Sequence, residues 1–388
     1  MVNSITSSPY VFQSSASYFE KLPKCLTSLV KRIFEATTGY FLKVSVFSLA
    51  AFQGRFSKWI IAPVVLTVTN FWKRVKGISQ QHAAIDSKRL ENGAAFLREF
   101  AEVCTLTTPG GKVLPWVCYR PEKFEQWIRA NGGIRIGERI FPRQPGDWQR
   151  LKRLGEFKWF EQVGHSFRIP APVTGAQQIC VLRCQGFGRT MTMDKNFIGL
   201  HLAAGFNYAI FDWGKEVSIK SYFQDAEGGY QAALREGFSP SQIKIMGSCR
   251  ATFPISYLKE QHHAEGVDAV LIQPPPSLRE MIATYKPPAN WIGQLSLGAV
   301  EKDGEHFDSV RRFRSLRPSS GRLCLVMSEG DKTLPENTAD QFRNAASHAG
   351  PFEIIWDPKD NSGSDPHFAE PLRKPPIFER YTQFLVSR

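Results

Sequence analysis

The stretch Ile243-Lys244-Ile245-Met246-Gly247-Ser248-Cys249-Arg250-Ala251-Thr252 joins an apolar run to a turn of small residues. Gly247 and Ala251 flank Cys249 at the spacing of a sharp strand-to-helix turn, where the crowded backbone needs small neighbours. The spacing therefore predicts Cys249 at the tip of that turn. A thiolate there is a good nucleophile, because a helix N-terminus and a nearby cation such as Arg250 both favour it. A buried structural cysteine in the same turn is the alternative interpretation.

Short apolar runs alternate with helical stretches on both sides of this segment. That alternation is typical of a parallel sheet with crossover helices. A hairpin is expected at residues 103–107 and 113–119, with Pro109-Gly110-Gly111 as its turn. Further strands are predicted at 179–184, 208–212, 243–247, 269–273, 323–327 and 353–356, and helices at 221–236, 251–260 and 336–349. The predicted fold class is therefore α/β, a mostly parallel sheet with helices on both faces.

Two of these strands are followed by residues that complete a catalytic set with Cys249. The strand at 323–327 leads into a turn that contains Asp331, and the strand at 353–356 leads into a polar loop that carries His367. Nucleophile, acid and histidine in this chain order is the arrangement of α/β-hydrolases. His367 would accept the proton of the nucleophile, and Asp331 would hold the imidazole in its tautomer. Taken singly, Asp331 is also an ordinary turn residue and His367 an ordinary surface histidine.

Two loops supply the remaining parts of such a site. In this arrangement the oxyanion is bound by the backbone N–H after the nucleophile and by one from a loop after an early strand. Here these are the N–H of Arg250 and the Gly186-Phe187 segment. A glycine-rich turn without a ligand is the alternative for the second loop, and Asp357 and Asp365 are alternative acids.

The chain resembles the chlamydial 43-kilodalton protein family, a group related to α/β-hydrolases, over most of its length. The superfamily pattern is matched at Gly247, Cys249 and Ala251, at Asp331 and His367, and at Gly186 and Phe187. Dienelactone-hydrolase-like enzymes are similar in using a cysteine nucleophile. The chain departs from the pattern at Thr252 and Gln185, where a glycine and a histidine are common. The resemblance implies an α/β-hydrolase-like fold and leaves the substrate open.

Composition shifts divide the chain into a helical N-terminal segment, residues 1–88, and an α/β-hydrolase-like domain, residues 89–388. Within the domain, residues 121–172 have no clear period and are interpreted as an insertion. Residues 274–320 are framed by prolines and too long for a simple crossover, so a lid is expected there.

The formal charge of +13 is concentrated at the front of the chain. Residues 1–76 contain ten basic and two acidic residues, a net charge of +8. An anionic membrane surface is therefore a possible partner of this segment, and packing of its apolar faces onto the domain is the alternative. Its uncharged runs, 44–54 and 59–72, are shorter than the about 20 residues of a spanning helix. Nucleic-acid binding is disfavoured, because the arginine cluster at residues 311–317 belongs to no reading motif.

No metal and no cofactor are expected. The seven cysteines lack zinc-type pairing, and the close pair Cys180 and Cys184 is interpreted as core packing. Residues 1–17 are polar, so no cleavable signal peptide is expected and the predicted location is cytoplasmic or membrane-associated.

The residues thus predict a hydrolase of esters, thioesters or amides, which acts on a small-molecule acyl substrate through a Cys-His-Asp triad and an acyl-cysteine intermediate. The alternative is a catalytically inactive hydrolase-fold protein that acts in membrane or host-protein interaction. The reactivity of Cys249 distinguishes the two.

Overall fold

The computed structural model describes residues 95–185, 194–213, 219–284, 306–358 and 370–387. All of them belong to one compact unit, formed by Leu90–Thr284 and His306–Arg388. No helix within these ranges is long and apolar enough to cross a membrane, and residues 1–76 lie outside them.

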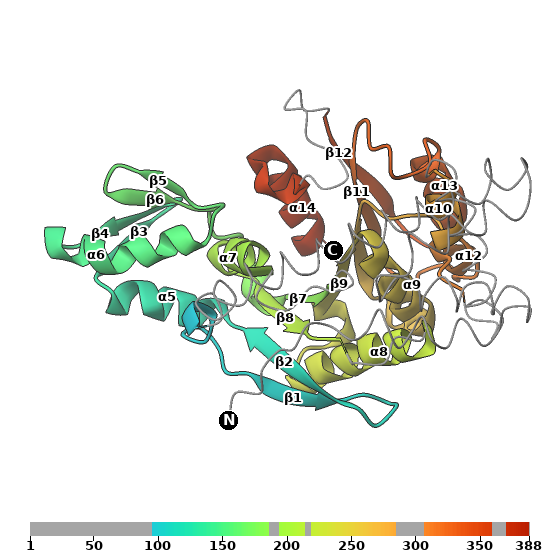
Figure 1. The fold of residues 1–388 in the computed structure, drawn as a ribbon, viewed down its shortest axis with the longest axis horizontal. Coiled ribbons are helices and arrows are strands. Elements are labelled where there is room, and N and C mark those ends of the chain that lie inside the picture. The colour runs from blue at the N-terminus through green and yellow to red at the C-terminus, as the bar shows by residue number, and fades with distance from the viewer. Residues whose placement is uncertain (1–94, 186–193, 214–218, 285–305, 359–369, 388) are drawn as a thin grey trace, which may run out of the picture. The chain divides into compact units, whose positions relative to one another are not determined.

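An eight-stranded sheet forms the centre of the unit (Figure 1). Its strands are β1 (Cys104–Thr107), β2 (Val113–Tyr119), β7 (Cys180–Cys184), β8 (Asn207–Phe211), β9 (Ile243–Ser248), β10 (Asp268–Ile272), β11 (Leu323–Ser328) and β12 (Phe352–Asp357). They lie in the order β1-β2-β8-β7-β9-β10-β11-β12. The strand β2 pairs antiparallel with β1 and with β8, and every later pair is parallel. Six parallel strands therefore end at one common edge.

Helices cover both faces of this sheet. Side chains alternate along each strand, so that Met246 of β9 packs in one core and Ile245 in the other. The first core is closed by α7 (Lys195–Ala204) and α14 (Pro375–Val386). The second is closed by α8 (Ile219–Arg235), α9 (Thr252–Gln261), α12 (Ser309–Arg314) and α13 (Thr338–Ala346). With the exchanged order of β7 and β8 and an antiparallel β2, this is an α/β-hydrolase-type fold, and the predicted fold class is confirmed.

The segment between β2 and β7 contains regular structure that its sequence did not indicate. It forms the helices α5 (Pro121–Ala130) and α6 (Trp148–Leu151) and the strands β3 (Gly133–Ile136), β4 (Arg139–Pro142), β5 (Glu161–Val163) and β6 (Ser166–Arg168). The strands make a second, antiparallel sheet in the order β3-β4-β6-β5. Strands of three or four residues are too short to produce a visible period, which explains the difference.

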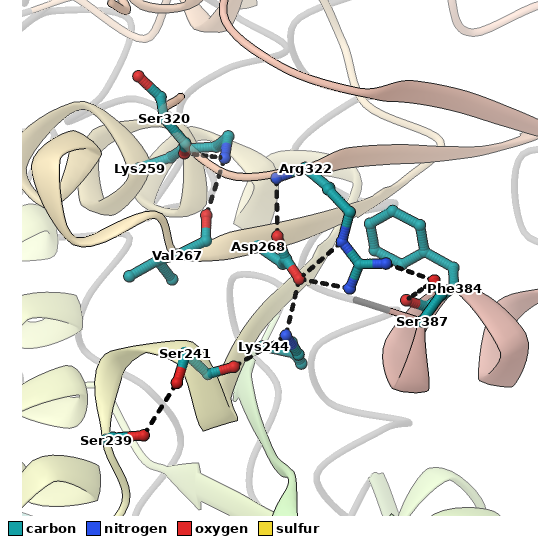
Figure 2. A network of polar contacts seen from close by, with 10 residues as sticks. All are labelled: Ser239, Ser241, Lys244, Lys259, Val267, Asp268, Ser320, Arg322, Phe384 and Ser387. Carbon is teal, nitrogen blue, oxygen red and sulfur yellow. Dashed lines mark hydrogen bonds and ion pairs between the residues drawn. The ribbon is translucent and has the colours of Figure 1, made fainter. Parts of the chain in front are cut away.

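Asp268 binds together the amino ends of three neighbouring strands (Figure 2). Its Oδ2 accepts hydrogen bonds from Lys244 Nζ at 2.7 Å and from Arg322 Nη2 at 2.5 Å, and its Oδ1 accepts one from the Arg322 backbone N–H at 2.7 Å. The Arg322 guanidinium also lies 4.6 Å from the centre of the Phe384 ring and donates to Ser387 Oγ, which joins α14 to the network. This ion-pair network therefore lies at the edge opposite to the common carboxyl ends of the strands.

Candidate active site

Cys249 occupies a strained turn between β9 and α9. The strand ends at Ser248, a single 3-10 turn spans Cys249–Ala251, and α9 begins at Thr252. The φ angle of Cys249 is 52°, in the left-handed region that a residue with a side chain rarely adopts. Such a conformation costs about 1–3 kcal/mol and occurs often at functional sites. The turn directs Cys249 away from the sheet at its carboxyl edge, where it is half-buried.

The small residues of the turn are required by close backbone contacts. A Cβ atom added to Gly247 would lie 2.5 Å from the carbonyl oxygen of Ala251 and 2.8 Å from the side chain of Ile255. Only glycine fits between β9 and the first turn of α9. The predicted strand–turn–helix geometry around Cys249 is therefore present, and its cause is the steric one inferred from the sequence.

The predicted acid, Asp331, follows β11, which is the second strand after β9. It lies three residues beyond the end of β11, where its Oδ1 accepts a hydrogen bond of 2.8 Å from the backbone N–H of Thr333. One strand, β10, separates β9 from β11, and neighbouring strands are about 4.8 Å apart. The turns that carry Cys249 and Asp331 thus leave the same edge of the sheet.

His367 lies outside the described residues, so its distance to Cys249 is not part of the geometry. Its loop follows β12, which pairs parallel with β11 and ends at the same edge. The backbone N–H of Glu329 donates to the carbonyl of Asp357 at 2.9 Å, so the two loops start side by side. The described chain before this loop therefore ends at the same edge of the sheet as the turns of Cys249 and Asp331.

The alternative acid Asp357 already has a partner. Its side chain is 2% exposed and its Oδ1 accepts a hydrogen bond of 2.6 Å from Lys374 Nζ at the start of α14. A carboxylate in a buried ion pair is poorly suited to orient a histidine as well. Asp365, the other alternative acid, lies outside the described residues. Asp331 therefore stays the preferred acid.

The first predicted oxyanion loop begins beside the elbow, although Gly186 and Phe187 lie outside the described residues. The last paired residues of β7 and β9 are Cys184 and Gly247, so the loop leaves the sheet next to the turn of Cys249. Arg250, which would supply the second N–H, is exposed one residue after Cys249.

Gln185, which replaces the common histidine, anchors the start of this loop. It is fully buried, and its Nε2 donates to the carbonyl of Phe211 at 3.1 Å and to Asp212 Oδ1 at 3.4 Å. Its own carbonyl oxygen accepts hydrogen bonds from Trp213 Nε1 at 3.0 Å and from the Tyr222 hydroxyl at 3.4 Å. The departure from the family pattern thus has a structural role.

Tyr222 and Trp213 belong to the site although sequence reasoning did not single them out. Their ring centres are 4.0 Å apart, and Tyr222 lies near Cys249 and Arg250. Burial raises the pKa of Tyr222 well above its usual range, so the phenol stays protonated. Trp213 follows β8 at the common carboxyl edge, which is the one sequence signal that could have indicated it.

The described part of the chain holds no group of three side chains suited to bind a metal ion. Cys180 and Cys184 both lie fully buried in the core on the α8 and α9 side of the sheet. Burial raises the pKa of both thiols, which keeps them protonated.

Comparisons with known proteins add to this description. No family model matches the chain, and no curated protein matches it. Among solved structures it is similar to a puromycin hydrolase, with 13% identity and a TM-score of 0.47 over 74% of this chain and 38% of that one. It is similar to an esterase of Pyrococcus furiosus, with 12% identity and a TM-score of 0.44 over 74% of this chain and 89% of that one. It is also similar to an acylaminoacyl peptidase of Pyrococcus horikoshii, with 12% identity and a TM-score of 0.45 over 74% of this chain and 41% of that one.

At these identities the similarity is one of fold. The aligned region spans only about two fifths of the puromycin hydrolase and of the acylaminoacyl peptidase. The assignment to an α/β-hydrolase-type fold rests on the strand order and on the turn at Cys249 in this chain.

Proposed function

We propose that the chain is a hydrolase of esters, thioesters or amides that uses Cys249 as its nucleophile. The observation that carries the proposal is the positive φ of Cys249 at the tip of a strand–turn–helix in which Gly247 is sterically required. That geometry is costly, and a structural cysteine gains nothing from it. Among the described cysteines, Cys180, Cys184 and Cys324 are buried in the core, whereas Cys249 is half-buried at the carboxyl edge.

The proposed reaction proceeds in two steps. The thiol of Cys249 gives its proton to His367 as its sulfur attacks the acyl carbon, and His367 then transfers that proton to the leaving alcohol, thiol or amine as its bond to the acyl carbon breaks. The N–H of Arg250 and the Gly186-Phe187 loop bind the oxyanion. A water then gives a proton to His367 and attacks the acyl-cysteine, which releases the carboxylate and restores the thiol. Asp331 orients His367 throughout.

The test is hydrolysis of p-nitrophenyl acetate and butyrate, together with intact-protein mass measurement of the acyl adduct. Cys249→Ala is expected to lose about 10³-fold or more in rate and to form no adduct, whereas Cys104→Ala keeps both. Cys104 is exposed on β1 and is a control for the loss of a thiol. Full hydrolysis by Cys249→Ala would exclude Cys249 as the nucleophile.

The partners of Cys249 are tested in the same assay. His367→Ala and Asp331→Asn are each expected to lower the rate by about 10²-fold or more, with unchanged circular dichroism. Asp340→Asn is the matched control, because Asp340 is exposed and, among the described residues, pairs with its helix neighbour Arg343. A His367→Ala variant that unfolds would instead indicate a structural histidine, and one with full activity would eliminate the triad.

A second candidate function rests on the charge of +8 in residues 1–76. In this view a hydrolase-fold body without turnover is attached to an anionic membrane surface by its basic, aromatic segment. Co-sedimentation with phosphatidylserine vesicles tests it, comparing the full chain with a chain that starts at Asp86. Binding that weakens with salt and is lost on truncation supports the attachment, and a full chain that ignores the vesicles excludes it.

The relation to the chlamydial 43-kilodalton protein family is a proposal of the same kind. It rests on the residues quoted for it, Gly247, Cys249 and Ala251 above all. No family model or curated protein supports it.

A further inference from the structure

A crevice of about 470 Å³ lies between α5, the strand β3 and the C-terminal end of α7. This volume falls within the range of small-molecule sites. Its walls come from the segment between β2 and β7 and from α7, and they include none of the residues around Cys249. The α5–β3 crevice is therefore separate from the candidate active site.

Arg135 closes the floor of the crevice and is fully occupied in doing so. Its Nη1 lies 2.5 Å from Glu125 Oε1, and its Nη2 donates to the carbonyls of Pro170 and Ala203, both at 2.6 Å. Its Nε donates to the carbonyl of Gly137 at 3.2 Å. Arg135 is neutralised by Glu125 and held by three backbone carbonyls. Arg135 therefore has a structural role, and Glu125 is not a free acid.

Two other arginines, Arg129 and Arg143, line the crevice. The N–H of Gly132 donates to the carbonyl of Arg129 at 3.1 Å, and the carbonyl of Gly132 accepts from the N–H of Arg143 at 2.8 Å. Gly132 therefore joins the backbone at Arg129 to the backbone at Arg143, at the point where α5 leads into β3. Both arginines line the crevice and are exposed, and neither has an ion-pair partner among the described residues.

Asp147, a carboxylate near Gly132, pairs with another arginine. Asp147 lies against Gly132, but it is ion-paired with Arg150 and accepts a hydrogen bond of 3.1 Å from the backbone N–H of Gln144. The end of the crevice at Arg129 and Arg143 thus carries two uncompensated positive charges. Guanidinium groups in such a pair are suited to bind a carboxylate or a phosphate group through several hydrogen bonds.

The remaining walls are apolar. They are formed by Pro121, Ile128, Ile134, Pro172 and Leu202. Ile134 is 42% exposed although it belongs to a strand, so an apolar surface is open to a ligand there. A ligand that satisfies both parts has an anionic group at one end and a hydrocarbon group at the other.

We infer that the α5–β3 crevice binds a small amphipathic anion, with its carboxylate or phosphate on Arg129 and Arg143 and its hydrocarbon part against Ile134 and Pro172. The inference does not depend on the proposed hydrolase activity. It predicts that the charged group and the apolar group both contribute to affinity.

Calorimetric titration of the full chain with hexanoate, hexyl phosphate and hexan-1-ol tests the inference. At least one of the two anions is expected to bind ten-fold or more tightly than hexan-1-ol, and tighter than acetate or inorganic phosphate. The ratio between hexanoate and hexyl phosphate identifies the head group. Equal binding of the anions and the alcohol, or no binding of either anion at millimolar concentration, would overturn the inference.

Two sets of variants locate the site. Arg129→Gln with Arg143→Gln is expected to lower the affinity for the anion ten-fold or more, whereas Arg168→Gln, an exposed arginine of β6 outside the crevice, leaves it unchanged. Ile134→Glu is expected to abolish binding, and Ile136→Glu is its control, because Ile136 is 65% exposed on the same strand but does not line the crevice. Circular dichroism verifies folding, and unchanged affinity in the double variant would refute the site.

Discussion

The hydroxyl of Thr252 donates a hydrogen bond of 2.6 Å to the carbonyl oxygen of Cys249. Thr252 is fully buried at the first position of α9, so its hydroxyl is shielded from solvent. The bond joins the strained residue to the helix that follows it. Thr252, which stands where glycine is common in the superfamily pattern, thus holds the turn in place.

Removal of this hydroxyl should loosen the turn. We expect Thr252→Val, which keeps the shape of the side chain, to lower the free energy of unfolding by about 1 kcal/mol, because the Cys249 carbonyl loses its side-chain donor. Thr252→Ser keeps the hydroxyl and should retain the bond. Urea unfolding monitored by tryptophan fluorescence measures both. A Val variant as stable as the Ser variant would show that the bond contributes nothing.

A methyl group at Gly247 should disturb the same turn by steric overlap. Its Cβ would lie 2.5 Å from the backbone carbonyl oxygen of Ala251, and a backbone atom cannot move aside as a side chain can. We expect Gly247→Ala to cost about 1–3 kcal/mol in unfolding free energy. Gly146→Ala is the control, because nothing lies within 4 Å of an added Cβ there, and it should change stability by less than about 0.5 kcal/mol. Equal stabilities would contradict the close approach of β9 and α9.

The cysteines should differ in their rates of alkylation. Burial raises the pKa of Cys180, Cys184 and Cys324, so these thiols should react only when the protein unfolds. Cys104 is exposed and should react at the rate of an ordinary thiol. Cys249 is less exposed, yet we expect it to react first, because it is the proposed nucleophile at the tip of the turn between β9 and α9. Brief iodoacetamide labelling followed by peptide mapping gives the order. If exposure alone decides, Cys104 will precede Cys249 and the nucleophile assignment fails.

Lys259 should make stability depend on pH above neutrality. It is 1% exposed, and its Nζ donates to the carbonyls of Val267 at 2.8 Å and Ser320 at 2.7 Å (Figure 2). Burial lowers the pKa of Lys259 to about 7, although Asp268 favours the charged form. The pKa in the unfolded chain is about 10.4, so between these two values the unfolded chain binds more protons than the folded one. Stability contributed by Lys259 therefore rises with pH across this window.

The variant Lys259→Met isolates this contribution. The free energy of unfolding of the unsubstituted chain should rise relative to that of the variant by up to about 1.4 kcal/mol per pH unit between about pH 7 and 10. Lys123→Met, an exposed lysine of α5, should leave the slope unchanged. Urea unfolding at pH 7, 8 and 9 gives the slopes. Parallel slopes for the chain and the Lys259→Met variant would mean that this lysine remains charged when buried.

The parallel strands β7 to β11 were predictable from sequence because each is buried on both faces. The predicted strands 243–247 and 323–327 correspond to β9 (Ile243–Ser248) and β11 (Leu323–Ser328), each within one residue. Buried parallel strands appear as continuous apolar runs that end at turn residues, so their bounds are legible. The antiparallel sheet β3-β4-β6-β5 was not legible, since its strands are short and partly exposed, as at Ile134 and Ile136.

The residues of the candidate site also differ in whether the sequence could indicate them. Cys249 and Asp331 were found by the order of motifs along the chain, which depends only on local sequence. Tyr222 was missed, because it meets the loop at Gln185 through a contact between residues 37 positions apart. Contacts of that kind arise from packing of α8 on the sheet and leave no local pattern. The roles of Cys249, Asp331, His367 and the Gly186-Phe187 loop all stay predictions.

The ion-pair network at Asp268 and the turn at Cys249 use opposite ends of the same strand, β9, since Lys244 lies near its beginning and Ser248 at its end. The ion pairs that join the strands and the proposed nucleophile therefore lie at opposite edges of the sheet. Loops at the carboxyl edge can be lengthened, shortened or replaced without disturbing the ion-pair network at Asp268. New substrate preferences could therefore be introduced by exchanging the loop that follows the carboxyl end of β10, while Arg322, just before β11, stays bound to Asp268.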